Sequence, residues 1–182
     1  MESETVRIQA KCRAALRSLD LSDLFTVEHL LCATGEKAGR QIVVRAADLS
    51  GSAPLGLVLE TPEAYTILHS RNTTKLHQRH IILHELAHVL LHLSEDVGAV
   101  PVRDNGIAAV VRKLIPDLHP DLESRIRART TYADVQEREA EQFATMVQTR
   151  LRVELPHQRT DEEFPAGLQD LFDAPARSKV AP

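Results

Sequence analysis

The segment from Lys75 to Leu93 constrains this chain more than any other part of its sequence. It contains no Gly or Pro, and as a helix it is apolar on nearly every side, through Ile81, Ile82, Leu83, Leu86, Val89, Leu90 and Leu91. A helix with an all-round apolar surface is usually buried, and this one is shorter than the about 20 residues that a membrane span needs. Three ionisable side chains nevertheless stand in its middle, His84, Glu85 and His88. Because burying such groups without partners is costly, we expect a partner that compensates them.

The spacing of these three residues indicates what the partner is. Residues four apart on a helix differ by about 40° in azimuth and about 6 Å along the axis, so His84 and His88 can reach one ion. Glu85 lies about 100° round from His84, where it can reach a water on the metal without ligating the metal. Zinc lowers the pKa of such a water toward ~7, and a glutamate can then take its proton as general base. We therefore predict a Zn²⁺ site with His84 and His88 as ligands and Glu85 as the catalytic residue. The alternative, two surface histidines beside a glutamate on a solvated helix, conflicts with the apolar flanks.

A third protein ligand is needed, because a catalytic zinc keeps one of its four positions for water. His92 continues the series but lies about 80° round from His84, so a straight helix does not easily bring both to one ion. A second predicted helix carries Glu137 and Glu141 on one face, whereas Glu139 points away. One glutamate of that face can complete a His-His-Glu set, and the other can accept the far N–H of a ligating histidine. A solvated acidic face is the alternative for this run.

Composition and length indicate an ordinary globular chain. The 182 residues fit a single domain, predicted over 1–155, with a poorly ordered tail over 156–182. A net charge of −4 argues against a nucleic-acid or membrane-surface binder. The acidic start of the chain lacks the apolar stretch of a signal peptide, so we predict a cytoplasmic protein. Cys12 and Cys32 have neither disulfide nor metal-site spacing and are expected to be small buried hydrophobes.

The remaining sequence predicts an α+β fold. A helix is expected over 5–19, and a second begins after Ser22 or Thr26 and ends at Gly35 or Gly39. Short β-branched runs separated by Gly and Pro predict a small antiparallel three-stranded sheet, with strands at 41–45, 57–59 and 64–68. This sheet should pack on the buried metal-binding helix. The rest of the chain is expected to form a loop over 94–106, a helix of about 107–115, a helical stretch from near Asp121 and a helix over about 132–151.

Two motifs together resemble a known family. They are His84-Glu85-Leu86-Ala87-His88-Val89-Leu90-Leu91-His92 and, after it, Glu137-x-x-Ala140-Glu141-x-Phe143-Ala144. Over about Gly39 to Ala144 the chain resembles the ImmA/IrrE family of zinc metallopeptidases, in its short actinobacterial form. The resemblance implies a gluzincin-like zincin fold with Glu137 as the third zinc ligand. It also implies site-specific cleavage of a DNA-binding repressor that has a helix-turn-helix domain.

Several roles and one alternative function stay open. Tyr132 or His119 could stabilise the oxyanion, and His77 and His80 are expected at the rim of the site or in solvent. A strand around 65–68 could be an edge strand that pairs with an extended substrate, or an inner structural strand. The main hypothesis is an endopeptidase whose partner is a protein substrate, with no direct nucleic-acid or membrane partner. The alternative is a zinc-stabilised binding module that sequesters a partner and has little or no peptidase activity.

Overall fold

The computed structural model describes residues 3–22, 25–49, 54–92, 99–101, 111, 127–129 and 132–151. Within these ranges the fold is mixed α+β, as predicted. The elements along the chain are α1 (Glu4–Arg17), α2 (Val27–Ala38), β1 (Gln41–Ala47), β2 (Gly56–Glu60), β3 (Ala64–Ser70), α3 (Lys75–His92), β4 (Ala99–Pro101), β5 (Arg127–Arg129) and α6 (Asp134–Gln148). The predicted tail over 156–182 lies outside the described residues, as does the predicted helix of about 107–115 apart from Val111.

The three predicted strands lie side by side in a sheet of order β1-β3-β2-β5-β4. The antiparallel prediction is confirmed for β2 and β3 but wrong for β1, which runs parallel to β3 with Val44 opposite Ile67. The physical reason is that β2 does not pair with the strand before it and lies on the far side of β3. Two short strands extend the sheet beyond β2. Of these, β4 falls inside the predicted loop and β5 inside the stretch predicted to be helical after Asp121.

The position of β3 decides one of the open alternatives. It is hydrogen-bonded to β1 on one side and to β2 on the other, so it is an inner strand. The expectation that residues 65–68 form an edge strand for a substrate is therefore wrong. Tyr65, Ile67 and Leu68 are buried, because both neighbours and the covering helices enclose this strand.

Local capping explains where the second helix begins and ends. The Thr26 hydroxyl accepts a hydrogen bond from the His29 backbone N–H at 3.3 Å, and His29 Nδ1 accepts one from the Thr26 N–H at 3.5 Å. Such a reciprocal pair satisfies two donors that a helix start leaves free. At the other end Gly39 adopts φ 66°, the left-handed conformation that suits glycine as a helix cap. Thr26 and Gly39, rather than Ser22 and Gly35, are thus the cap residues.

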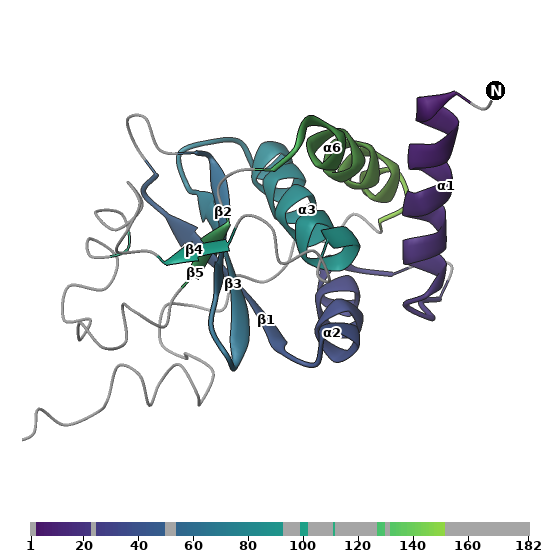
Figure 1. The fold of residues 1–182 in the computed structure, drawn as a ribbon. Coiled ribbons are helices and arrows are strands. Elements are labelled where there is room, and N and C mark those ends of the chain that lie inside the picture. The colour runs from purple at the N-terminus through teal and green to yellow at the C-terminus, as the bar shows by residue number, and fades with distance from the viewer. Residues whose placement is uncertain are drawn as a thin grey trace, which may run out of the picture.

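The metal-motif helix lies in the middle of the fold. In Figure 1, α3 runs between the sheet and the helices α6 and α1, with α2 beside its end, and it contacts all of these elements. The prediction of a buried helix is confirmed, since Leu83, Leu86 and Ala87 are fully buried. The α6 helix packs against it through one apolar stripe, Ala140, Phe143, Ala144 and Val147. This packing holds the glutamates of α6 beside the histidines of α3.

The two cysteines have different surroundings. Cys12 is fully buried on α1, as expected, but Cys32 is exposed on α2, so the prediction for Cys32 is wrong. On α2 the buried side is formed by Val27, Leu30 and Thr34, and Cys32 projects from another side. None of the helices in the described ranges combines the length and apolar character that a membrane crossing requires.

Candidate metal centre

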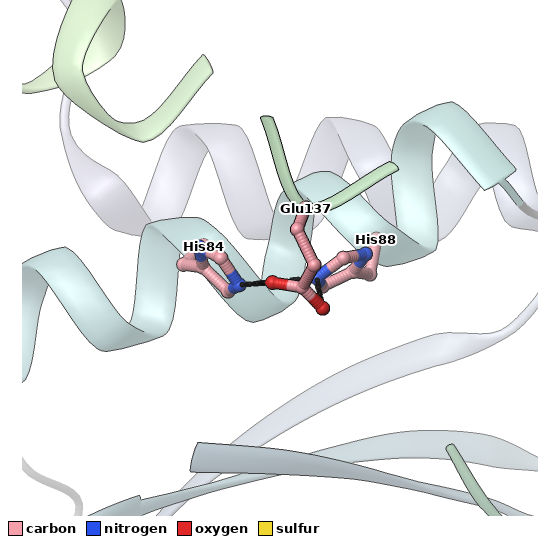
Figure 2. Close-up of side chains that lie close together, drawn as sticks. All are labelled: His84, His88 and Glu137. Atoms are coloured by element: carbon pink, nitrogen blue, oxygen red, sulfur yellow. Dashed lines mark hydrogen bonds and ion pairs between the residues drawn. The ribbon is translucent and has the colours of Figure 1, made fainter. Parts of the chain in front are cut away.

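Two helices bring together the predicted ligand set. His84 and His88 project from neighbouring turns of α3, and Glu137 reaches toward both from the first turn of α6 (Figure 2). The Nε2 atoms of His84 and His88 are 3.1 Å apart. Glu137 Oε2 lies 3.2 Å from His84 Nε2, and Glu137 Oε1 lies 3.7 Å from His88 Nε2. Within the described residues this is the one group of three or more potential ligands that converges on a common point.

These separations fit a tetrahedral ion. Ligand atoms bound at 2.0–2.2 Å in tetrahedral geometry lie about 3.3–3.6 Å from one another. Two separations, 3.1 and 3.2 Å, lie just below that range, whereas the 3.7 Å separation joins His88 to the other oxygen of Glu137. With one ligand atom taken from each residue, the three atoms lie within 4.8 Å of one another, so the group could hold an ion once its side chains adjust. Without a cation the same arrangement places two imidazole nitrogens and a carboxylate in close contact.

The three side chains differ in their access to solvent. The His88 side chain is 1% exposed, that of His84 21% and that of Glu137 47%. The group is thus anchored in the core on one side and open to solvent on the other. An open side is what distinguishes a catalytic metal site from a structural one, which is usually closed by four protein ligands.

Glu85 lies beside this group but is not part of it. Its side chain is buried, and its carboxyl lies against Gly56 at the start of β2. Burial, reinforced by the negative charge of Glu137, raises the pKa of Glu85 to about 8. A cation held by the neighbouring ligands would favour the charged carboxylate and oppose this rise. The carboxyl lines the same cleft as the ligand group, where it can exchange a proton with a molecule bound there.

An open cleft of about 300 Å³ gives access to the site. Its apolar lining is formed by Pro54 and Leu55, which precede β2, by Gly56 at the start of β2, and by Ile81 on α3. The cleft is also lined by the proposed ligands and the general base, His84, His88, Glu137 and Glu85. The remaining lining residues are Tyr132, His77, His80 and Glu141. His77 is exposed and His80 partly exposed, which agrees with their expected places at the rim.

Tyr132 contacts one of the two histidines directly. Its ring stacks on that of His88, with 3.5 Å between the centroids and 9° between the planes. The ring therefore restricts how the imidazole can rotate. A role of the Tyr132 hydroxyl at the oxyanion stays a prediction, and His119 lies outside the described residues.

Glu141 is not in the converging group, although it shares a helix face with Glu137. Its Oε2 lies 2.9 Å from His80 Nε2 but 3.7 Å from His84 Nδ1, beyond the length of a hydrogen bond. With a side chain 58% exposed, Glu141 contributes to the rim of the cleft. Its expected support of a ligating histidine is therefore indirect at most.

His92 is not a member of the ligand group either, but it contacts one of the ligands, His88. Its Nδ1 lies 3.3 Å from His88 Nδ1, and its Nε2 lies 2.8 Å from Glu139 Oε2. Burial raises the pKa of Glu139, but the hydrogen bonds from Lys11 and His92 outweigh this, and the net direction is downward. Glu139 is consequently held as a carboxylate.

Sequence reasoning missed this role of Glu139. It does point away from the face of Glu137, as predicted, but toward the core. A signal for this is present in the sequence. Glu139 stands four residues before Phe143 and eight before Val147, which places it on the buried stripe of the helix.

Comparisons with protein-family models, with curated proteins and with solved structures gave no match to this chain. The case for a metal centre therefore rests on side-chain geometry and on the two motifs that provide those side chains.

Proposed function

We propose that this chain is a zinc-dependent endopeptidase of the zincin type. His84, His88 and Glu137 hold Zn²⁺, and Glu85 is the general base. One observation carries the proposal: three ligand atoms converge, with one side open to solvent, beside a buried carboxyl in the same cleft.

The donor set favours zinc over other divalent ions. Two imidazoles and one carboxylate with an open position are a ligand set of catalytic zinc sites, whereas Mg²⁺ and Ca²⁺ prefer oxygen ligands alone. Glu137 stands in the first turn of α6, and the exposed fraction of its side chain, 47%, leaves room for water and substrate beside it.

The chemistry divides between the ion and the chain. When bound, zinc would act as a Lewis acid that polarises the scissile carbonyl and lowers the pKa of water, so that a nucleophile can form at neutral pH. Glu85 takes one proton from the attacking water as the new C–O bond forms. It then delivers that proton to the leaving amine nitrogen as the C–N bond breaks. The residue begins and ends as a carboxylate, so the hydrolysis is balanced.

The substrate class is proposed from the resemblance to the ImmA/IrrE family. We propose a DNA-binding repressor with a helix-turn-helix domain as the substrate. The open cleft along α3, with an apolar wall on its β2 side, supports a polypeptide segment rather than an enclosed small molecule.

The test combines the zinc-loaded protein with a purified transcriptional regulator that has a helix-turn-helix domain. We expect cleavage by the wild type and none by Glu85→Gln, which keeps the shape of the side chain and should retain the bound zinc. Glu28→Gln, an exposed position on α2 away from the cleft, is the matched control and should cleave like the wild type. Stable binding of the regulator without cleavage by the wild type would overturn the endopeptidase and favour the zinc-stabilised binding module.

A further inference from the structure

A row of polar side chains extends from His88 into the core, away from the cleft. It runs from His88 through His92 to Glu139 and ends at Lys11 on α1. The contacts measure 3.3 Å between the two Nδ1 atoms, 2.8 Å from His92 Nε2 to Glu139 Oε2 and 2.6 Å from Lys11 Nζ to the same oxygen. The side chains of His88 and His92 are each 1% exposed and that of Glu139 is 9% exposed, whereas Lys11 reaches solvent.

When His92 is neutral, the chemistry of these groups fixes the direction of each hydrogen bond in the row. An ammonium group only donates and a carboxylate only accepts, so Lys11 and His92 Nε2 both donate to Glu139. A neutral His92 then has its lone pair on Nδ1, where it accepts the proton of His88 Nδ1. His88 Nε2 is then the unprotonated nitrogen of the ring and carries its lone pair. That nitrogen is the one 3.7 Å from Glu137 Oε1 and 3.1 Å from His84 Nε2.

The opposite arrangement would prevent metal binding at His88. If His92 carried its proton on Nδ1, it would donate to His88 Nδ1 and leave the proton of a neutral His88 on Nε2. A protonated nitrogen cannot ligate a metal. The carboxylate of Glu139 opposes this arrangement, because it requires a donor at His92 Nε2.

We propose that Glu139 and His92 are positioning residues that hold His88 in the tautomer whose Nε2 is free to bind the metal, with Lys11 fixing Glu139. The inference rests on the proposed metal site and assigns to it a support that reaches the ligand through a second histidine. Groups that hydrogen-bond to ligating histidines set both tautomer and ring orientation. The contacts that orient the His88 ring include the hydrogen bond to His92 and the stacked ring of Tyr132.

His84 has no comparable support in the contacts that the structure shows. Its Nδ1 lies 3.7 Å from Oε2 of Glu141, whose side chain is exposed. The two histidine ligands are therefore unequal. His88 is the buried ligand, whose tautomer and ring orientation are fixed before metal binds. His84 lies on the open side of the site, where its ring can reorient.

The test reads histidine tautomers in the full-length protein labelled with ¹⁵N at histidine. Long-range ¹H–¹⁵N spectra are recorded without metal and with zinc, and zinc affinity is measured by chelator competition. In the wild type we expect the proton of His88 on Nδ1 and that of His92 on Nε2, already in the metal-free protein. Glu139→Met removes the acceptor, so it should mix the tautomers and weaken zinc binding by about 10- to 100-fold.

Two variants serve as controls for this test. Glu139→Gln keeps an acceptor oxygen and should retain most of the affinity. Glu141→Met removes a carboxylate that lies on the same helix but does not contact the row, so the tautomer of His88 should not change. Should Glu139→Met fail to fold, His92→Phe and His92→Gln carry the same comparison, because only glutamine offers His88 an acceptor.

A proton on His88 Nε2 in the metal-free wild type would overturn the proposal. Unchanged tautomers and zinc affinity in both acceptor-free variants, Glu139→Met and His92→Phe, would overturn it as well. This outcome is distinct from failure of the proposed function. A protein that cleaves no regulator would contradict the endopeptidase, whereas the tautomers of the metal-free protein are read without substrate or ion.

Discussion

Gly56 on β2 lies so close to Glu85 on α3 that residue 56 has no room for a side chain. A Cβ placed there would lie 2.6 Å from Glu85 Oε1 and 3.0 Å from Glu85 Cγ, and 2.5 Å from Ile81 Cγ2. Contacts this short force one of the partners to move. The sheet and the metal-motif helix thus fix together where the carboxyl of Glu85 stands.

Gly56→Ala should consequently displace Glu85 and lower the rate of cleavage. A catalytic group misplaced by about 1 Å can cost on the order of 100-fold, so we expect a loss of about 10- to 100-fold in kcat/KM. Zinc content should stay at the wild-type level, because none of the three proposed ligands is touched. The measurement is peptide or regulator cleavage at equal zinc loading.

Gly35→Ala is the matched control for Gly56→Ala. Its Cβ would lie 2.9 Å from the carbonyl oxygen of Arg40, so it creates a comparable clash away from the cleft. Overpacking of this kind typically costs about 1–3 kcal/mol of stability. We expect both variants to lose stability but only Gly56→Ala to lose activity per folded molecule. Equal activity of the two would contradict the proposed place of Glu85.

The two cysteines should react at very different rates. Burial, followed by the negative charge of Glu139, raises the pKa of the Cys12 thiol from 9.0 to about 11. Only the thiolate is nucleophilic, so Cys12 should resist a thiol reagent at pH 8 and become reactive only as the pH approaches about 11. Exposed Cys32 should react at once. Titration should therefore count one fast thiol in the native protein and two after unfolding, and two fast native thiols would contradict the packing of α1 on α6.

Tyr132 should support zinc binding through its ring. Aromatic stacking contributes about 0.5–1.5 kcal/mol, so Tyr132→Ala should weaken zinc affinity by about 2- to 10-fold. Tyr132→Phe keeps the ring and should bind zinc like the wild type. If Tyr132→Phe weakens zinc binding as much as Tyr132→Ala, the hydroxyl rather than the stack on His88 is responsible. A loss of cleavage in Tyr132→Phe at full zinc content would support the predicted oxyanion role.

Local patterns were sufficient to predict the elements that carry the site. The apolar surface of α3 predicts its burial, and the four-residue spacing of His84 and His88 predicts that they share a face. Both properties belong to a single helix and need no knowledge of the rest of the fold. The caps of α2 are equally local, since Thr26 and Gly39 act on the backbone beside them.

The errors concern pairing between distant segments. The three-stranded sheet was predicted to be antiparallel, but β1 runs parallel to β3. The row from His88 to Lys11 joins three helices, and Lys11 is 128 residues from Glu139. A single helix pattern shows that Glu139 shares the buried stripe of Phe143, but not which groups meet it there.

A zinc-binding comparison of Glu137→Ala with Glu141→Ala tests whether Glu137 completes a zinc site with His84 and His88. The two glutamates stand one turn apart on α6, and both line the cleft. Loss of a group that only supports a ligand costs about 10- to 100-fold in affinity, so loss of a ligand itself should exceed about 100-fold. We predict one zinc per chain in the wild type and in Glu141→Ala, and a loss of more than about 100-fold in affinity for Glu137→Ala. A wild type that binds no zinc, or a Glu137→Ala variant that binds it like Glu141→Ala, would rule out Glu137 as the third ligand.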